Sequence, residues 1–325
     1  MRRTHHNLYN LLKILNDGQI HDGTGIGETL GLTRSAVWKA IKKLEQYDIP
    51  IESIKGKGYC LAEPLILLEE EKILSHLSNT QDISIDIFET IRSTNDYFKT
   101  NTPGTPFSFC FAEMQTQGRG RLNREWHSPF GKNLYMTCHY QFNRDISALA
   151  GLSLAIGLAV FQAIKIQGID DLLKVKWPND ILYQQKKLAG ILIEINAESH
   201  GACHANIGIG MNVNSAIEKT LSITQPWTSL SEITQNTFDR NVLAANLIEQ
   251  IIHHIQTFES SGLTKFVDIW KKHDALIHQP ITLIQNTKKI TGQGVGIDQH
   301  GNLLLKLSKN EIQAFSSGDV SIQKQ

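Results

Sequence analysis

The sequence feature that most constrains the fold is an apolar stretch without charges near the middle of the chain, SALAGLSLAIGLAVFQAI, Ser147 to Ile164. It is short for a membrane span, which needs about 20 apolar residues, and the polar Ser153 and Gln162 interrupt it. Its apolar side chains recur at helical spacing, at Leu152, Ile156, Ala159 and Ala163. The stretch therefore predicts a buried helix, over 147–167, that lies across the back of a β-sheet.

The segments on both sides of this helix supply the sheet. Five stretches have the β-branched and aromatic composition of strands, at 83–91, 107–115, 134–142, 172–195 and 203–214. A second helical stretch, Arg240–Ser260, follows them. Because helices and strands mix along the chain, we expect a large domain of the α+β class with a mixed sheet.

The first 65 residues have a different sequence pattern, which predicts three short helices and a hairpin. In the third helix, LTRSAVWKAIKKLEQY, Thr33 is a suitable N-cap. Three apolar residues form the stripe that would be buried, namely Val37, Ile41 and Leu44. The outer face carries Arg34, Lys39, Lys42 and Lys43 against Glu45, four positive charges and one negative, which gives net +3. With the glycine turn before it, this helix predicts a helix-turn-helix.

A wing follows the helix-turn-helix. The stretch IPIESIKGKGYCLAEP places two β-rich runs around Gly56 and Gly58, with Lys55 and Lys57 between them. A basic helix followed by a basic wing favours a winged helix-turn-helix that binds DNA over a charged face that is merely solvated. The predicted DNA-binding residues are Thr33, Arg34, Ser35, Trp38, Lys39, Lys42, Lys43 and Lys57.

The charge and cysteine content limit the function classes. Basic and acidic residues number 32 each and the pI is about 7.2, so nucleic-acid binding has to come from the local basic patch. The four cysteines lie far apart without a CxxC pair, which argues against a zinc site and a disulfide framework and favours a reducing cytoplasm. Polar residues interrupt the apolar stretch near the N-terminus and no cleavage site follows, so we expect no signal peptide and no membrane contact.

The end of the chain changes texture again, to short strands separated by Gly, Asn and Asp turns, which predicts a small β-barrel. We therefore expect three domains: the winged helix-turn-helix at 1–65, the large domain at 66–274 and the barrel at 275–325.

The stretch QTQGRGRLNREWHS, Gln115–Ser128, lies between two predicted strands and has the size of a functional loop. It is not the dinucleotide fingerprint, because Asn123 stands at the third glycine position and no strand and helix frame it. Three arginines carry more N–H donors than we expect the loop to satisfy internally, namely Arg119, Arg121 and Arg124. They predict a phosphate or carboxylate ligand. Trp126 is either a core residue or a flat surface for a purine.

A second group of candidates lies in KVKWPNDILYQQKKLAGILIE, Lys174–Glu194. Lys187 comes directly before an apolar strand, so its ammonium group would be partly desolvated and would need an anion nearby. Lys186 is expected to be solvated at the hairpin tip. Asp180 is either a metal or ribose partner or an Asx-turn residue, and the turn is the simpler interpretation.

Two further stretches place polar side chains at strand ends. Ser93, Thr94 and Asn95 follow a predicted strand, where they either cap a helix or contact a ligand. IGIGMNVN, Ile207–Asn214, closes a strand with two glycines and paired asparagines, which fits a turn or the wall of a ligand site.

The order and content of these segments resemble one bacterial family, the bifunctional biotin–protein ligases and biotin operon repressors, also called biotin–[acetyl-CoA-carboxylase] ligases. The resemblance covers essentially the whole length. It rests on GETLGLTRSAVWKAIKKL, KGKGYCLAEP, GRGRLNREWHSPFGKNLYMT, KWPNDI, KKLAGILIE and GIGMNVN. Asn123 stands where the family often has Gly.

The resemblance implies the fold and the residue roles. The central sheet would be of the class II biotin/lipoate ligase type, and the barrel would be SH3-like. The implied biotin-binding residues are Ser93, Thr94, Asn95, Gln115, Arg119, Gly120, Arg121 and Lys187. Trp126, Asp180 and Asn212 would contact ATP or the adenylate. Arg119, Arg121 and Lys187 would be the catalytic residues.

It also implies a reaction: biotin and ATP form biotinyl-5′-AMP, and biotin passes to a lysine of the biotin carboxyl carrier protein. Two anions must meet, so positioned cations, with Mg²⁺, would carry the catalysis. Biotinyl-AMP would be the corepressor, and the adenylate-bound protein would bind operator DNA as a homodimer.

Two other functions fit parts of the sequence. A regulator that only senses biotin would need Ser93 to Asn95 and Gln115, but not Arg119, Arg121 and Lys187 together. A lipoate-type ligase would share the fold, but the RGR loop and the N-terminal DNA-binding domain argue against it. We therefore favour an active ligase that also represses.

Overall fold

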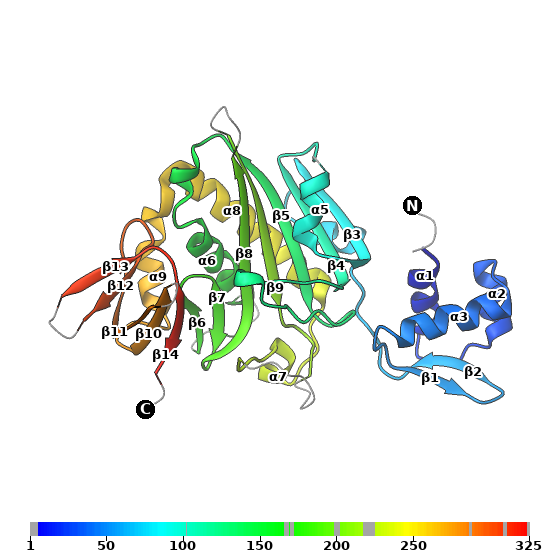
Figure 1. Cartoon of the computed structure of the whole chain (residues 1–325). Helices are drawn as coiled ribbons and strands as arrows, with labels where there is room; N and C mark the ends of the chain where they lie inside the picture. Colours follow the sequence, from blue (N-terminus) through cyan, green and yellow to red (C-terminus); the bar gives the residue numbers. More distant parts are fainter. Residues whose placement is uncertain are drawn as a thin grey trace.

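The computed structural model describes residues 6–101, 103–165, 169, 172–197, 202–216, 225–285, 288–307 and 311–323. A small helical unit, a large sheet covered by helices and a small β-unit follow one another from the N-terminus to the C-terminus (Figure 1). This is the α+β organisation that the sequence predicts.

The N-terminal unit is a winged helix. It consists of α1 (His6–Leu15), α2 (Gly23–Leu30), α3 (Arg34–Glu45) and the antiparallel hairpin of β1 (Ile51–Ile54) and β2 (Gly58–Leu61). The predicted apolar stripe of α3 packs with leucines of α1 in one cluster, which includes Leu8, Leu11, Leu12, Leu15, Val37, Ile41 and Leu44. The prediction for this unit is confirmed.

Two local features set the turn between α2 and α3. Gly31 has φ +64°, in the left-handed region that glycine adopts without strain, and it ends α2. Thr33 Oγ1 then accepts a hydrogen bond from the Ala36 N–H at 3.3 Å and caps α3. The apolar stripe of α3 thus faces α1 and α2, and its basic side chains stay exposed.

The central unit is a seven-stranded mixed sheet with the order β3-β4-β5-β9-β8-β7-β6. Its strands are β3 (Ile83–Ile91), β4 (Phe107–Gln115), β5 (Leu134–Phe142), β6 (Leu173–Lys176), β7 (Asp180–Tyr183), β8 (Lys186–Ala197) and β9 (Cys203–Met211). Only β3 and β4 run parallel, and the other neighbours are antiparallel. All five predicted β-rich stretches form strands, and 172–195 folds into three of them.

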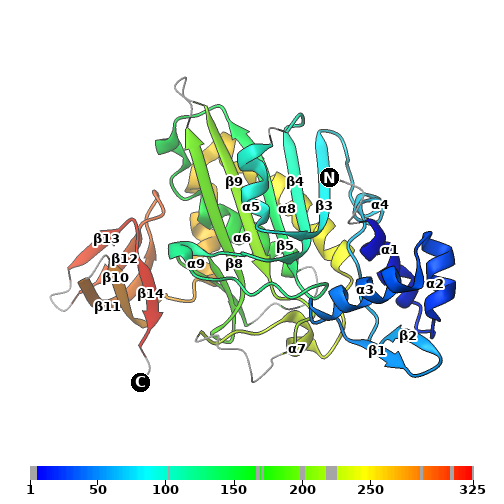
Figure 2. The ribbon, with the colours of Figure 1, turned by 45° about the vertical axis from the view of Figure 1, so that its right-hand side comes forward.

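Helices lie on both faces of this sheet. α6 (Leu152–Lys165) and α8 (Arg240–Ser261) lie side by side behind the strands in Figure 1, whereas α5 (Thr94–Thr100) lies in front of them in Figure 2. The remaining helices are α4 (Glu70–Ser75), α7 (Leu230–Thr234) and α9 (Val267–His273), with short 3-10 turns η1 (Arg121–Asn123), η2 (Ile146–Leu149) and η3 (Gly262–Lys265). The face that carries α5 is the more open one.

The long apolar stretch forms the predicted core helix, with a correction at its start. η2 is a separate turn and Gly151 has φ +82°, so the helix begins at Leu152 and not at Ser147. Its expected end at Gln167 lies outside the described residues. In the described part of the chain, Ile146–Ile164 is the one segment whose length and composition would allow a membrane span. Since 61% of that apolar window is buried in the protein, it fits a core helix.

The C-terminal unit is a five-stranded antiparallel sheet with the order β13-β12-β11-β10-β14. It contains β10 (Pro280–Gln285), β11 (Lys288–Ile297), β12 (Leu303–Lys306), β13 (Ile312–Phe315) and β14 (Asp319–Ile322). The sequence predicts a small β-barrel at 275–325, and the small all-β C-terminal domain is confirmed as this antiparallel sheet. Leu283 and Phe315 belong to the same apolar cluster as the central sheet and its helices.

A buried arginine holds the polypeptide between the winged helix and the sheet. Arg240, at the start of α8 and fully buried, donates from Nε to the Ile66 carbonyl at 3.0 Å and pairs with Glu113 of β4 at 2.5 Å. Glu113 also accepts a hydrogen bond from the Leu68 N–H at 2.6 Å. A buried charge is costly unless it is paired and hydrogen-bonded, and both charges here are. The clamp fixes the linker at 66–68 to the sheet.

The winged helix and the sheet also share apolar side chains. Phe130, which follows the arginine-rich loop, is only 4% exposed and lies in the winged-helix cluster. Its ring is parallel to that of Tyr47, with the centroids 6.1 Å apart. The winged helix therefore packs where the loop 115–128 ends.

Candidate active site and DNA-binding cleft

The predicted ligase-site residues come from segments that meet at the sheet face covered by α5, the helix in front of the strands in Figure 2. Gln115 ends β4, Ser93 to Asn95 open α5, Lys187 lies on β8 and Asn212 follows β9. In the sheet order, β4, β5, β9 and β8 are successive neighbours, so these segments become adjacent in space.

A set of polar side chains at the start of α5 forms one hydrogen-bonded group. Gln115 Oε1 accepts from the Thr94 N–H at 2.9 Å, and its Nε2 donates to Ser128 Oγ at 3.2 Å. Thr137 Oγ1 of β5 donates to Asn95 Oδ1 at 2.6 Å and lies 2.8 Å from Thr94 Oγ1. All these donors and acceptors are buried or half-buried, which suits recognition of a small polar ring.

Ser93 occupies the N-cap position of α5, but its side chain makes no capping hydrogen bond. It is buried, with 3% of its surface exposed. The helix-capping interpretation of Ser93 therefore holds for its backbone and not for its hydroxyl group.

Three glycines form a flat floor under the site. A Cβ atom on Gly208 would come closer than 3.0 Å to Asn95, and one on Gly210 closer than 3.0 Å to the indole of Trp126. On Gly190 of β8 it would lie 3.1 Å from both Trp126 and Lys187. Glycine is required at these positions because the overlying side chains pack directly against the strand backbone and leave no room for a Cβ atom. They explain the IGIG and LAGIL patterns of the sequence.

Trp126 and Lys187 lie next to each other on this floor. The ammonium group of Lys187 is 5.3 Å from the centroid of the Trp126 ring, within the range of a cation–π contact. The indole Nε1 is buried and has no hydrogen-bond partner among the described residues. A flat aromatic face with an adjacent cation is suited to a nucleotide.

Asp180 provides the anion that the sequence predicts next to Lys187. Its Nζ lies 2.8 Å from Asp180 Oδ1, and the side chains are 19% and 13% exposed. The contact is an ion pair by distance, and Asp180 Oδ1 lacks a partner with the directional geometry of a hydrogen bond. Asp180 opens β7 beside Lys187, so the Asx-turn interpretation, the simpler one from the sequence, misses its charged contact.

The arginine-rich loop folds back on itself as a narrow ribbon. The backbone N–H of Trp126 donates to the Gly118 carbonyl at 2.9 Å, and the backbone N–H of Gly120 donates to the Arg124 carbonyl at 2.7 Å. Leu122 and Asn123 at the tip have φ of 55° and 54°. Asparagine tolerates this left-handed region better than most residues, so Asn123 can replace a glycine there.

The three arginines have partners within the protein but outside the loop, so the loop does not satisfy them internally, as expected, and their partners are protein groups from other segments. Arg119 forms a two-pronged ion pair with Asp96 at 2.6 and 2.8 Å and lies 3.3 Å from Glu194. Arg124 pairs with Asp319 of the C-terminal unit. Arg121 donates to Asn179 Oδ1 at 3.4 Å and to the Gly318 carbonyl at 3.2 Å, which are neutral acceptors. The sequence could not identify these partners, because they come from distant segments of the chain.

Asn212 is brought close to Lys187 but is committed to the backbone. Its Nδ2 donates to the Thr228 carbonyl at 3.1 Å and lies 3.5 Å from the Lys187 carbonyl. Asn212 thus joins the segment around Thr228 to β8. The predicted contact of Asn212 with the nucleotide would have to use its side-chain oxygen, Oδ1.

The structure also brings in residues that sequence reasoning missed. Thr137 contacts Thr94 and Asn95, and alternation along β5 could have placed it on the polar face. Lys176, in the KWPND motif, ends β6 opposite Asp180. Burial lowers its pKa and Lys187 acts in the same direction, while Asp180 acts against them. A desolvated lysine at that position is a further cation for an anionic ligand.

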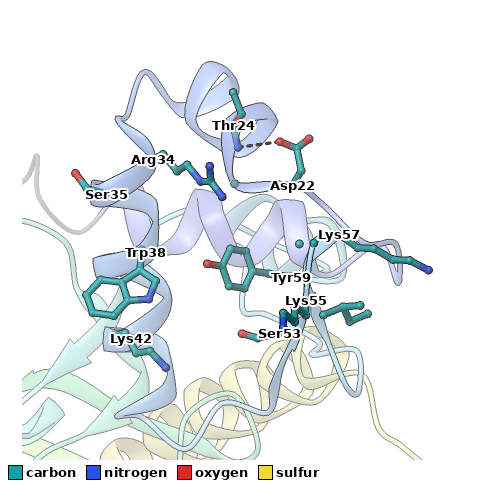
Figure 3. Close-up of a pocket in the computed structure, with 14 residues that line it drawn as sticks. Asp22, Thr24, Arg34, Ser35, Trp38, Lys42, Ser53, Lys55, Lys57 and Tyr59 are labelled. Atoms are coloured by element: carbon teal, nitrogen blue, oxygen red, sulfur yellow. Dashed lines mark hydrogen bonds between the residues drawn. The ribbon is translucent and has the colours of Figure 1, made fainter.

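Five of the eight predicted DNA-contacting residues line a cleft between α3 and the wing, with a volume of about 900 Å³ (Figure 3), namely Arg34, Ser35, Trp38, Lys42 and Lys57. Arg34, Trp38 and Lys42 project from the helix, and Lys55 and Lys57 from the turn of the hairpin. Thr33, Lys39 and Lys43 are exposed on the same unit but do not line the cleft. Trp38 has 52% of its surface exposed. Lys42 has an ion-pair partner within α3, since its amine lies 2.6 Å from Glu45.

Comparisons with known proteins agree with this organisation. Residues 7–60 match the model of the HTH domain, 87–212 that of the biotin/lipoate A/B protein ligase family, and 276–322 that of the biotin protein ligase C terminal domain. The bifunctional ligase/repressor BirA of Escherichia coli (strain K12) is 37% identical over 314 residues, 96% of each chain. BirA of Bacillus spizizenii is 30% identical over 92% of this chain and 93% of that protein.

A solved structure shares the fold of about three quarters of the chain. The biotin protein ligase from Aquifex aeolicus in complex with biotin and ATP has a TM-score of 0.63 and 27% identity, and the match covers 74% of this chain and 99% of that one. Together with the winged helix, the arginine-rich loop and the glycine floor, similarity along nearly the whole chain shows that this protein belongs to the bifunctional ligase/repressor family of biotin protein ligases.

Proposed function

We propose that this protein joins biotin and ATP to form biotinyl-5′-AMP and transfers the biotinyl group to a lysine of the biotin carboxyl carrier protein. We propose further that it represses biotin synthesis by binding operator DNA, with biotinyl-AMP as corepressor. The observation that carries the ligase function is Lys187, which lies half-buried between Asp180 and the Trp126 ring on a floor of glycines.

The first step brings two anions together. A carboxylate oxygen of biotin forms a bond to the α-phosphorus of ATP, and the bond from that phosphorus to the bridging oxygen breaks to release pyrophosphate. Lys187 and Arg121 would offset the repulsion and stabilise the charge that develops. Arg121 suits this task because its protein contacts are to neutral oxygens, which leaves its charge available to a ligand.

The polar group at the start of α5 would hold the ureido ring of biotin. Gln115, Thr94 and Asn95 already form a connected set of donors and acceptors, so little ordering is needed when the ring binds. Ser93 adds a buried hydroxyl group that does not cap the helix. Gly120 would let the loop backbone approach the ligand.

The second step needs a nucleophile from the acceptor protein. The lysine amine of the carrier protein attacks the carbonyl carbon of the mixed anhydride, AMP leaves, and the amine loses its proton. A loop folded over the adenylate would exclude water until the acceptor arrives. This role fits the loop 115–128, which reaches β14 through Arg124 and Asp319.

Mg²⁺ would neutralise charge on the ATP phosphates during the first step. The described residues contain no group of three or more His, Cys, Asp or Glu side chains that could hold a metal ion. Mg²⁺ commonly binds through one or two protein carboxylates and the substrate phosphates. A single carboxylate is therefore sufficient, and Asp180 would supply it.

For repression, we propose a homodimer that forms when biotinyl-AMP is bound and that places two α3 helices on a two-fold-related operator. The domain borders would be those expected from the sequence, 1–65, 66–274 and 275–325, and the place of action would be the cytoplasm.

The test is pyrophosphate release from ATP upon addition of biotin, with purified protein and no acceptor. We expect about one equivalent per chain, with the adenylate retained, and Lys187→Met should slow the release by at least about a hundredfold, as expected for a group that stabilises the transition state. Biotin binding without release would instead favour the regulator that only senses biotin. Labelled biotin and lipoate in competition separate the two ligase specificities.

A further inference from the structure

Arg119 lies in an ion-pair network that the biotin ligase reaction does not require. Its two terminal nitrogens donate to the two carboxylate oxygens of Asp96 at 2.8 and 2.6 Å, and Glu194 lies 3.3 Å away on the other side. Asp96 belongs to α5 and Glu194 to β8, so one guanidinium group joins the loop to two separate elements.

The charges of this network are balanced. Lys99 of α5 lies 3.0 Å from both Asp96 and Glu194, which makes two cations for two carboxylates. The hydrogen bonds from Arg119 hold the pKa of Asp96 well below its ordinary value. Burial acts to raise the pKa of Glu194, but hydrogen bonds from Asn95 and Lys99 outweigh it and the pKa is lowered. Both carboxylates are therefore charged at neutral pH, and little of the charge of Arg119 is left for an anionic substrate.

The network also reaches the proposed ring-binding group. Asn95 Nδ2 donates to Glu194 Oε2 at 3.0 Å, and its Oδ1 accepts from Thr137. The same carboxylate thus orients Asn95 and contacts Arg119. At the other end, the loop ribbon begins at Gly118 directly beside Arg119 and carries Trp126 on its return strand. The position of Arg119 therefore determines where the loop lies over the site.

We propose that Asp96 and Glu194 hold Arg119 as a latch that seats the loop 115–128 on α5 and β8, and that Arg119 is a positioning residue and not a catalytic one. The three loop arginines then have separate tasks. Arg119 fastens the loop to the central sheet, Arg124 fastens it to the C-terminal unit, and Arg121 keeps its charge for the ligand. The anionic ligand assigned to Arg121 rests on the proposed ligase function. The contacts that assign Arg119 and Arg124 to fastening the loop do not.

The first test needs no ligand. The arginines of the loop are sites for trypsin, and Leu122 at the tip is 74% exposed. Asp96→Asn removes the charge and one acceptor of the two-pronged pair, and a hydrogen bond to a charged group contributes about 1.5–3 kcal/mol. We expect limited trypsin digestion to cut the ligand-free variant within the loop about ten to a hundred times faster than the unaltered protein. Glu71→Gln, an equal charge loss on the exposed face of α4, is the matched control and should not change the rate.

The second test separates positioning from catalysis. Asp96→Asn and Arg119→Lys should each raise the KM for biotin about ten- to hundredfold, with kcat at saturating biotin changed less than about twofold, because substrate binding can still select the seated loop. In a double-mutant cycle, Asp96→Ala with Arg119→Ala should be no worse than either single variant.

A direct role of Arg119 gives a different pattern. In that case Arg119→Lys lowers kcat, whereas Asp96→Asn frees the arginine and leaves KM unchanged or lower. That result, or a digestion rate unaffected by Asp96→Asn, would overturn the latch. An unaltered protein that releases no pyrophosphate would refute the ligase function instead, and the digestion experiment would still decide the latch. Thermal unfolding by circular dichroism confirms that each variant is folded.

Discussion

At the scale of single residues, the absence of three Cβ atoms shapes the site. Gly190, Gly208 and Gly210 give up strand propensity in the middle of a sheet, which is unfavourable for the sheet alone. In return, the side chains of Asn95 and Trp126 lie directly on the backbone. The floor therefore serves the ligand site at a cost to the sheet.

A methyl group on this floor should affect the nucleotide more than biotin. In Gly210→Ala the new Cβ would come closer than 3.0 Å to the indole of Trp126 and displace the ring. We expect the KM for ATP to rise by about two- to tenfold, since an aromatic contact of this kind contributes about 0.5–1.5 kcal/mol beyond its buried area. Biotin affinity, measured by calorimetry, should stay within about threefold.

The control for this substitution is Gly104→Ala. A Cβ there meets nothing within 4 Å. If both variants raise the KM for ATP equally, the floor is not what positions Trp126.

The sequence indicated some of these residues and not others. Lys187 was identifiable because a cation directly before an apolar strand needs an anion. Asp96 and Glu194 were not, because their importance arises only when α5 and β8 meet the loop in space. Asp180 shows the same limit, since the turn that it follows is local and its partner Lys187 is not.

At the scale of elements, the basic face of α3 is the clearest case. Its cap, its apolar stripe and its exposed lysines could all be predicted, because a helix is a local structure with a fixed period. The long strands β3, β4 and β5 match the predicted stretches for the same reason. The short helices α7 and α9 were missed, since few residues carry their pattern and tertiary packing decides whether they form.

Lys43 is the residue of choice to test this element, because Lys42 is held by Glu45. Lys43→Ala should weaken operator binding at all sequences and reduce the slope of log K against log salt by about one, as expected for one lost phosphate contact. Biotin-dependent pyrophosphate release should be unchanged. Filter binding at several salt concentrations measures the slope, and a loss of ligation would contradict separate domains.

At the scale of the whole molecule, a carboxyl group lies where the winged helix meets the sheet. Glu89 of β3 accepts a hydrogen bond from the Tyr9 N–H of α1 at 3.2 Å. Burial raises its pKa to about 7, against the effects of this hydrogen bond and of Lys43. The protonated form is thus favoured by folding, and the contribution of Glu89 to stability is complete below its ordinary pKa of 4.5 and is lost as the pH rises through about 7.

The neutral variant Glu89→Gln should remove this pH dependence. We expect it to be more stable than the unaltered protein at pH 8, by about 1 kcal/mol after allowing for partial exposure, and similar at pH 4.5. Thermal unfolding at both values, with Glu71→Gln as the control, measures the difference. If the melting temperature of Glu89→Gln and that of the unaltered protein change equally between pH 4.5 and pH 8, Glu89 is not the cause of the pH dependence.

The packing of Phe130 against Tyr47 has a consequence for any shortened form of this protein. The ring belongs by sequence to the ligase but is covered by the DNA-binding unit. A chain that begins after residue 65 would therefore expose an aromatic side chain beside Met114 and Leu67, and such a patch promotes self-association. Solubility of the isolated ligase should then depend on this one position, and Phe130→Ser is expected to restore a monodisperse monomer.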